Sequence, residues 1–449
     1  MGPARFRNPG AQPAEESPGA AGNQLKFHGK CVKISSRERG IHRRWKARGK
    51  DVNCAPKLRQ QALRESILLL QRNLTSGGVR AASWTPHSRS RNYTRVFSRD
   101  AAICALGMAV SGVADLEEGA ARSMAFLARH QAGNGQIPNG VDPETGETDF
   151  WYVGCIDATL WWLVAVDFLS KHSPQGAPLR EELSGNLRGA IDWLLCQEHQ
   201  KFRLLQQNEA SDWADIMPRS GFVLYTNALW YHVKRLFGLP GAEETRANSH
   251  RLFLPHTEGP APEDRRLRLL AEHSRDRGKG GDLYLSYVNF FRWGEEGDVF
   301  GNLLAVLFGL ADRSRAGRVL DALKAAGVDR PFPVRAVCTP LAPSGPEWRE
   351  YMGRHRQNGE YEYHNGGAWP FLGGFWVLAL SAMGREAEAR EGMSALARMN
   401  RRGRWGFREW FHGATGEPRG MAGQSWNAGM YLLAEVSLER DLFPKVPPI

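Results

Sequence analysis

Residues 160–166 read Leu-Trp-Trp-Leu-Val-Ala-Val, and residues 301–308 read Gly-Asn-Leu-Leu-Ala-Val-Leu-Phe. Neither stretch has a continuous polar face, so a helix formed by either one must be covered by protein on nearly all sides. Such a helix is typical of the inner layer of a helical bundle or ring. The two stretches therefore predict an all-α fold with an inner layer of apolar helices.

Apolar periodicity, together with helix start and stop signals, predicts twelve helical segments around these stretches. They are expected near residues 56–74, 99–113, 115–130, 156–171, 180–197, 222–238, 242–254, 299–310, 312–326, 368–382, 385–400 and 423–438.

The connections between these segments alternate in length. Short links such as Leu239-Pro240-Gly241 and Met383-Gly384 alternate with long loops. Among the short links, only the one at 172–179 is longer than the rest. The long loops are expected at residues 75–98, 131–155, 198–221, 255–298, 327–367 and 401–422. Loops of this length in a compact domain are usually functional. The pattern predicts an (α/α)6 toroid of six helical hairpins, with the long loops forming a pocket on one face.

The net charge of +11 is concentrated at the N-terminus. Residues 1–59 hold 14 Lys and Arg against four Asp and Glu, which leaves a net charge of only +1 for the rest of the chain. Basic tails without periodicity are usually solvated. We therefore expect a disordered basic extension over residues 1–55, a catalytic domain over residues 56–449, and no nucleic-acid partner.

Composition and motif searches exclude several classes of protein. The six Cys form no Cys-x-x-Cys pair, and neither a signal peptide nor a membrane-length apolar span is evident. Phosphate-binding loops, zinc-protease and nucleophile-elbow motifs are also absent from the sequence. We expect a cytoplasmic protein with no cofactor, no metal and no membrane partner; the sequence leaves its oligomeric state open.

Two carboxylates stand in aromatic surroundings at the edges of the long loops. Asp157 precedes the apolar stretch 160–166, where it could be a helix cap or a general acid whose pKa is raised by burial. Glu409 lies in Phe407-Arg408-Glu409-Trp410-Phe411, where it could be a surface residue paired with Arg408. A pair of carboxylates at one rim is what glycoside hydrolysis requires, because one protonates the leaving oxygen and the other activates water or attacks the sugar.

Other segments of the same loops offer groups that could bind a sugar. Arg99-Asp100 opens a predicted inner helix, Asp212 and Asp215 flank Trp213, and the loops carry several more Trp side chains that suit flat sugar rings. His364-Asn365-Gly366-Gly367 offers polar donors where glycines permit a close approach. Each of these groups alone also has a structural explanation.

Four motifs, in this order, resemble those of the six-hairpin glycosidases, which include the alkaline/neutral invertases, the glucosidase moiety of glycogen-debranching enzymes and the processing α-glucosidases. The motifs are Phe97-Ser98-Arg99-Asp100, Ile156-Asp157-Ala158-Thr159-Leu160-Trp161-Trp162, His364-Asn365-Gly366-Gly367-Ala368-Trp369-Pro370, and Glu409 followed by Gln424-Ser425-Trp426. The resemblance covers roughly residues 60–438. It implies an inverting hydrolase with Asp157 as general acid and Glu409 as general base. The sugar pocket it implies comprises Arg99, Asp100, Trp151, Trp213, Asp215, His364, Asn365, Trp369, Gln424 and Trp426.

The resemblance leaves the substrate open. The segment from His364 to Trp369 is similar to the invertases, whereas residues 157–161 and 227–231 are more similar to the debranching glucosidases. We expect an oligosaccharide or small glycoside with a terminal α-linked glucosyl residue, as for an amylo-α-1,6-glucosidase, with sucrose hydrolysis as the alternative. A polysaccharide lyase would require a more basic cleft than this nearly neutral body suggests. A non-catalytic carbohydrate-binding toroid remains the alternative of another class.

Overall fold

The computed structural model describes residues 54–443, except residues 152–153, 258–262 and 291. The extension expected over residues 1–55 therefore lies outside the described residues, apart from the two that begin the first helix. The described part consists of helices joined by loops that carry four small antiparallel sheets. The predicted all-α class is confirmed.

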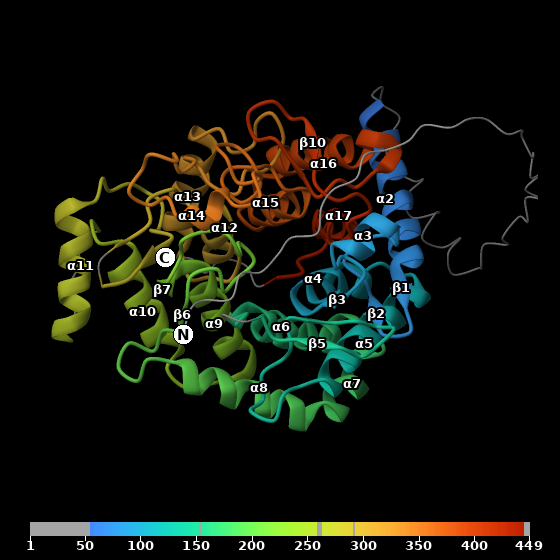
Figure 1. Ribbon diagram of the computed structural model, residues 1–449, viewed down its shortest axis with the longest axis horizontal. Coiled ribbons are helices and arrows are strands. Elements are labelled where there is room, and N and C mark those ends of the chain that lie inside the picture. Colours follow the sequence, from blue (N-terminus) through green and yellow to red (C-terminus); the bar gives the residue numbers. More distant parts are fainter. Residues whose placement is uncertain (1–53, 152–153, 258–262, 291, 444–449) are drawn as a thin grey trace, which may run out of the picture. The chain divides into compact units, whose positions relative to one another are not determined.

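Six buried helices form a closed inner ring (Figure 1). They are α4 (Ser98–Ala109), α6 (Ile156–His172), α9 (Leu224–Phe237), α12 (Val299–Leu307), α15 (Pro370–Ala382) and α17 (Ser425–Ser437). Each contacts the next in this order, and α17 returns to contact α4. They lie inside because they have almost no polar face; α15, for example, contains no charged residue.

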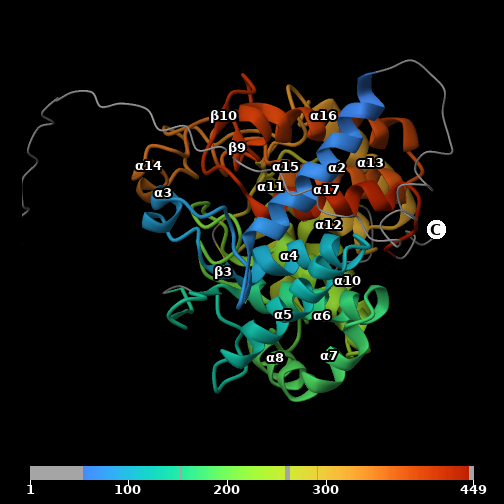
Figure 2. The same cartoon turned by 90° about the vertical axis from the view of Figure 1, so that its right-hand side faces the viewer.

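Six more helices form the outer layer, and each has a single apolar stripe. They are α2 (Cys54–Asn73), α5 (Ala114–Arg129), α8 (Ser184–Gln197), α10 (Ala242–Phe253), α13 (Arg313–Ala325) and α16 (Glu386–Trp405). In α5, Leu116, Ala120 and Leu127 are buried, while the acidic residues of its first turn face outward. Figure 2 shows α2 lying along α17, which it contacts together with α16. The predicted toroid of six hairpins is confirmed.

The structure departs from the expected segments by four additional helices among the described residues. The segment expected at 180–197 is two helices, α7 (Gly176–Glu182) and α8. The loop expected at 255–298 contains a further helix, α11 (Arg265–Arg277), which sequence reasoning missed because its buried stripe is only Leu267, Ala271 and Ser274 among many Arg residues. Two short helices, α3 (Pro86–Ser90) and α14 (Glu350–Gly353), also lie in long loops.

The sheets lie on the long loops, beside the N-terminal ends of the inner helices. The strands are β1 (Leu74–Thr75), β2 (Gly78–Val79), β3 (Val96–Phe97), β4 (Gly140–Val141), β5 (Thr148–Asp149), β6 (Gln206–Gln207), β7 (Gly221–Val223), β8 (Tyr287–Val288), β9 (Trp410–Phe411) and β10 (Pro418–Arg419). Their orders are β1-β2, β3-β4-β5, β6-β7-β8 and β9-β10. Because β3 runs directly into α4 and β7 into α9, the sheets hold the first turns of these inner helices in place.

Aromatic side chains fill the centre of the ring. The rings of Trp161 and Phe375 are 5.6 Å apart, and those of Phe300 and Phe375 are 4.8 Å apart. The indole N–H of Trp161 donates to the hydroxyl of Tyr225 at 2.7 Å, so the buried polar atom is satisfied. This packing fills the space between the inner helices with side chains.

Candidate active site

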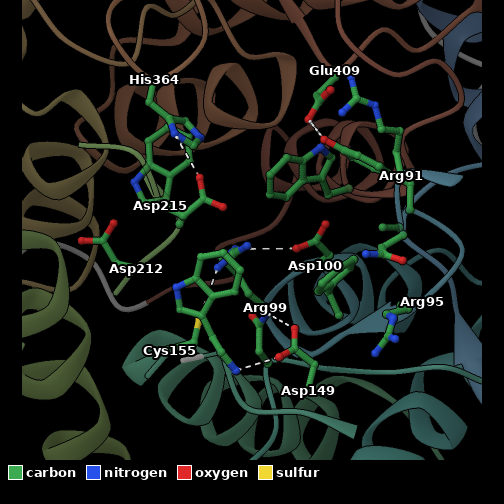
Figure 3. Close-up of a pocket in the computed structure, with 18 of the residues that line it drawn as sticks. Arg91, Arg95, Arg99, Asp100, Asp149, Cys155, Asp212, Asp215, His364 and Glu409 are labelled. Carbon is green, nitrogen blue, oxygen red and sulfur yellow. Dashed lines mark hydrogen bonds and ion pairs between the residues drawn. The ribbon is translucent and has the colours of Figure 1, made fainter. Parts of the chain in front are cut away.

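A pocket of about 440 Å³ opens at the N-terminal ends of the inner helices. Its volume falls within the roughly 300–1,000 Å³ typical of small-molecule sites. The loops before α4, α6, α9, α15 and α17 all contribute to its wall (Figure 3). The lining residues are Ala81, Arg91, Asn92, Tyr93, Arg95, Phe97, Arg99, Asp100, Asn139, Glu147, Thr148, Asp149, Trp151, Cys155, Asp212, Trp213, Asp215, Tyr363, His364, Trp369, Glu409 and Trp426.

Glu409 is buried in the pocket wall just before β9, and both of its carboxylate oxygens accept hydrogen bonds. Oε1 accepts from the hydroxyl of Tyr93 at 2.6 Å, and Oε2 accepts from the backbone N–H of Met421 at 2.8 Å. Burial raises the pKa of Glu409 to about 7; the two hydrogen bonds lower it, and the charges of Asp100 and Asp215 add to the rise. The side chain is therefore poised to exchange a proton near neutral pH.

Asp215 lies across the pocket from Glu409 (Figure 3). Its side chain is 44% exposed, and its Oδ1 is 3.6 Å from Nδ1 of His364, too far for a hydrogen bond. Desolvation raises the pKa of Asp215 to about 6, although Arg99 opposes the rise. Burial holds the pKa of His364 well below its usual value, so this imidazole is neutral and makes no ion pair with Asp215.

Asp157 does not reach the pocket. It is fully buried in the first turn of α6 and is absent from the lining. Its oxygens accept hydrogen bonds from Cys155 Sγ at 2.9 Å and Tyr225 Oη at 2.9 Å, and it pairs with Arg99 at 3.2 Å. The structure therefore places this carboxylate behind Arg99 and Cys155, outside the pocket lining.

Arg99 and Asp100 lie in the first turn of α4, and both line the pocket. Arg99 links the pocket to Asp157, because its Nη1 faces Asp157 while its Nε is 3.6 Å from Asp100 Oδ2. Burial raises the pKa of Asp100 to about 6, and the charge of Arg99 partly offsets that rise. Both residues thus line the pocket from the same helical turn.

Aromatic rings form one wall of the pocket. Trp213 packs edge-to-face on Trp369 at 5.6 Å and on His364 at 4.9 Å, and His364 stacks on Trp369. The indole nitrogens of Trp213 and Trp426 are buried and have no hydrogen-bond partner among the described residues. Unpaired buried donors of this kind can be satisfied by ligand hydroxyls.

The structure does not bring every expected residue to the lining. Asn365 is buried, and its amide joins two parts of the connection between α13 and α15 by accepting from Leu341 N–H at 2.7 Å and donating to Leu341 C=O at 2.9 Å. Gln424 is fully buried at the start of α17. Trp151, Trp369 and Trp426 do line the pocket.

Tyr93 and the hairpin of β4 and β5 were not expected at the site. Tyr93 stands seven residues before Asp100, and no helical period marks it as a neighbour of Glu409. In the hairpin, Asp149 accepts from Asn139 Nδ2 at 3.2 Å and from the backbone N–H of Trp151 at 2.8 Å. In the sequence, the hairpin is marked only by a polar turn between two short apolar runs. That pattern does not show in which direction the turn points.

Within the described part of the chain, no group of three or more His, Cys, Asp or Glu side chains is placed to hold a metal ion. The same residues contain no helix long and apolar enough to cross a membrane.

Comparison with known proteins finds relatives both in sequence and in fold. The model of the alkaline and neutral invertase family matches residues 291–441, which include His364, Trp369, Glu409 and Trp426. Probable alkaline/neutral invertase D of Arabidopsis thaliana is 31% identical over 157 residues, 33% of this chain and 27% of that protein. Cytosolic invertase 1 of Oryza sativa subsp. japonica is 30% identical over 156 residues, 33% of this chain and 26% of its own length. The chain thus matches about a quarter of the length of these relatives.

Solved structures share the fold over most of the chain. A GH63 mannosylglycerate hydrolase from Thermus thermophilus, in complex with Tris, superposes with a TM-score of 0.61 at 16% identity, covering 83% of this chain and 99% of its own. A structure described as a wild-type glycosidase has a TM-score of 0.56 at 17% identity, covering 88% and 100%. The chain has the (α/α)6 toroid fold of the six-hairpin glycosidases. Its C-terminal third is similar in sequence to the alkaline and neutral invertases.

Proposed function

We propose that this protein is an inverting glycoside hydrolase that removes a terminal glycosyl residue. The observation that carries the proposal is the placement of Asp215 and Glu409 on opposite sides of one pocket (Figure 3). Two carboxylates flanking a sugar are the chemical requirement of glycoside hydrolysis.

Hydrogen bonding distinguishes the roles of the two carboxylates. Both oxygens of Glu409 accept hydrogen bonds, which favours its ionised form and suits a general base. Asp215 has no hydrogen-bond donor among the described residues, so nothing holds its oxygens as acceptors and it can keep a proton for the leaving group. The two pKa values lie within about one unit of each other, so they do not decide the assignment.

The proposed reaction has one displacement step. Glu409 takes a proton from a water molecule, whose oxygen attacks the anomeric carbon, while Asp215 gives its proton to the glycosidic oxygen as the carbon–oxygen bond breaks. The water oxygen enters opposite the leaving group, so the first product has the inverted anomeric configuration. Transfer of a proton from Glu409 to Asp215 through solvent restores the starting state.

Asp157 takes a different part in this proposal from the general acid that the resemblance implied. Because it is fully buried and paired with Arg99, it acts through that residue as a positioning group. Arg99 in turn lies between Asp157 and the pocket, and its charge lowers the pKa of Asp215. Removing the charge of Asp157 would leave a buried guanidinium partly unpaired, which is costly.

The proposed substrate is a small glycoside with a terminal α-glucosyl residue. Sucrose is the second candidate, because the match to the invertase family covers the part of the pocket formed by residues 364–426. Hydrolysis of sucrose, isomaltose, maltose, limit dextrin and glucosylglycerate, followed by proton NMR of the first-formed anomer, tests activity, substrate and stereochemistry together. Hydrolysis of none of them would favour a sugar-binding toroid without activity, and a retained anomer would contradict inversion.

A glycosyl fluoride substrate can show which of two residues, Asp215 or Asp157, is the general acid. Fluoride departs without protonation, so an enzyme that lacks its general acid keeps activity on α-glucosyl fluoride but loses it on an ordinary glycoside. We expect Asp215→Asn to lose about 10²–10⁴-fold on the glycoside and to recover on the fluoride, whereas Glu409→Gln fails on both. The comparison variant is Asp157→Asn, which we expect to lose activity on both substrates. If Asp157→Asn were the only variant to recover activity on the fluoride, Asp157 would be the general acid.

A further inference from the structure

The backbone around Asp215 sets the direction in which its carboxylate points. Among the described residues no hydrogen bond reaches that carboxylate, since Nδ1 of His364, at 3.6 Å from Oδ1, is too far to make one. Asp215 and Ile216 stand at the centre of a turn. The N–H of Met217 closes this turn by donating to the C=O of Ala214 at 2.9 Å. The position of Asp215 in the pocket therefore depends on what holds the turn.

One side chain from a distant segment binds the turn beside Asp215. Nδ2 of Asn358 donates to the C=O of Ile216 at 3.0 Å. Asn358 is fully buried and stands 142 residues from Ile216 along the chain, so this bond joins two separate loops. The other side-chain bond at the turn, from the N–H of Ala214 to Asp212 Oδ1 at 2.8 Å, lies within one segment. It stabilises the shape of the turn, but it does not fix the turn against the rest of the pocket wall.

Asn358 is itself held on its other side by a second buried amide. Its Oδ1 accepts from the N–H of Asn365 at 2.9 Å, and its C=O accepts from Nδ2 of Asn365 at 3.3 Å. Asn365 is bound in turn to both backbone groups of Leu341. His364, which faces Asp215 in the pocket (Figure 3), directly precedes Asn365. The two amides thus tie the turn of Asp215 to the segment that carries its neighbour in the pocket.

We propose that Asn358 is a positioning residue for protonation of the leaving group, because it fixes the turn that presents Asp215. The inference rests on the proposed function, in which Asp215 is the general acid. The bond from Asn358 opposes rotation of the peptide group between Ile216 and Met217, a movement that would displace the carboxylate from the glycosidic oxygen. A general acid must stand within hydrogen-bond reach of the oxygen that it protonates, and a displacement of about 1 Å can cost about 100-fold in rate.

The dependence of the rate on the leaving group tests the proposal. Hydrolysis of α-glucosyl fluoride needs no general acid, whereas hydrolysis of an ordinary glycoside from the panel above needs one. For Asn358→Ala we expect kcat on the glycoside to fall by about 10–100-fold, and on the fluoride by less than about threefold. Both rates are measured on one preparation, so their ratio does not depend on the fraction of folded protein. Asn358→Asp keeps the volume and the bond from Asn365 but loses the Nδ2 donor, and should change the ratio in the same direction.

Asn248→Ala is the matched control for the loss of a buried amide. Nδ2 of Asn248 also donates to a backbone carbonyl of another segment, that of Phe202, at 2.9 Å. Asn248 is buried on the outer helix α10 and lies outside the pocket lining, so its removal should lower stability without changing the ratio of the two rates.

The outcomes separate this inference from the proposed function. An unchanged ratio in both Asn358 variants, with recovery of Asp215→Asn on the fluoride, would overturn the inference and leave the function standing. If Asp215→Asn did not recover on the fluoride, the assignment of the acid would be wrong, and this inference with it. Hydrolysis of none of the five glycosides of the panel would instead overturn the function itself.

Discussion

At the scale of single residues, the pocket shows how one physical effect acts on several carboxyl groups. Desolvation raises the pKa values of Asp100, Asp215 and Glu409, and each is then adjusted by different neighbours. Arg99 lowers the values of the two Asp residues, whereas hydrogen bonds from Tyr93 and Met421 lower that of Glu409. The protonation of the site is therefore set by donors from several loops as well as by the carboxylates themselves.

Tyr93 is expected to lower the pKa of Glu409, the proposed general base. Its hydroxyl donates to Glu409 at 2.6 Å and thereby favours the ionised carboxylate, so its removal must raise the pKa of Glu409 further. A hydrogen bond to a charged group is worth about 1.5 kcal/mol or more, which corresponds to about one pKa unit. For Tyr93→Phe we expect the pH optimum of kcat/KM to move to higher pH and the maximum to fall.

The control for this experiment is Tyr284→Phe. Tyr284 is also buried, but its hydroxyl contacts His250 outside the pocket. Its removal should leave the pH optimum in place. A Tyr93→Phe variant that loses rate equally at all pH values would show that Tyr93 acts on the substrate and not on Glu409.

In the sequence, aromatic surroundings indicated Asp157 and Glu409 as the pair of carboxylates, and the resemblance implied Asp215 as a sugar-binding residue. The sequence could not show that Asp157 and Asp100 differ in their position at the pocket, because both stand in the first turn of an inner helix. Asp100 lines the pocket, whereas Asp157 is turned behind Arg99. Which side of a first turn faces the pocket depends on the rotation of the helix in the ring, and neighbouring helices set that rotation.

At the scale of elements, close packing between α4 and α17 completes the ring. Gly107 of α4 lies against Gly429 of α17, and a Cβ atom at Gly107 would stand 1.9 Å from the carbonyl oxygen of Gly429. Because the obstacle is backbone, the two helices would have to separate to admit it. Their first turns carry Arg99, Asp100 and Trp426, so the spacing of the two helices also sets one side of the pocket.

Gly107→Ala is therefore expected to destabilise the protein. Overpacking a tight core costs about 1–3 kcal/mol, and more where backbone must move. Gly317→Ala is the matched change on the outer helix α13, where a Cβ atom meets nothing within 4 Å, and it should stabilise the fold by about 0.5–1 kcal/mol through helix propensity. Urea denaturation of both variants measures the difference. Equal stability of the two would show that α4 and α17 separate easily.

At the scale of the whole molecule, the ring closes entirely within the described residues. Contacts run from α4 through α6, α9, α12 and α15 to α17, which meets α4 again and is covered by α2. The pocket that the ring creates takes residues only from the range 81–426. The described residues of the ring and of the pocket lining thus lie within residues 81–437.

Removal of residues 1–53 is accordingly expected to leave the protein folded and any activity intact. The deleted segment carries most of the net charge, so its loss should change the isoelectric point and the binding to ion-exchange resins far more than the stability. We expect the melting temperature to shift by less than about 2 °C, which corresponds to under about 1 kcal/mol for a protein of this size. Failure of the shortened chain to fold would show that the deleted segment packs on the toroid.

The sequence by itself determined the helical class, the alternation of short and long connections and, through these, the toroid with its pocket on one face. These features follow from local periodicity, because a helix that is apolar on all sides can only be an inner one. Only the tertiary structure decided which carboxylates meet in the pocket, that Tyr93 holds Glu409 across 316 residues of chain, and that Asp157 is turned away. Such neighbours depend on helix rotation and loop path, which are set by packing between segments far apart in the chain and leave no periodic signal in either segment.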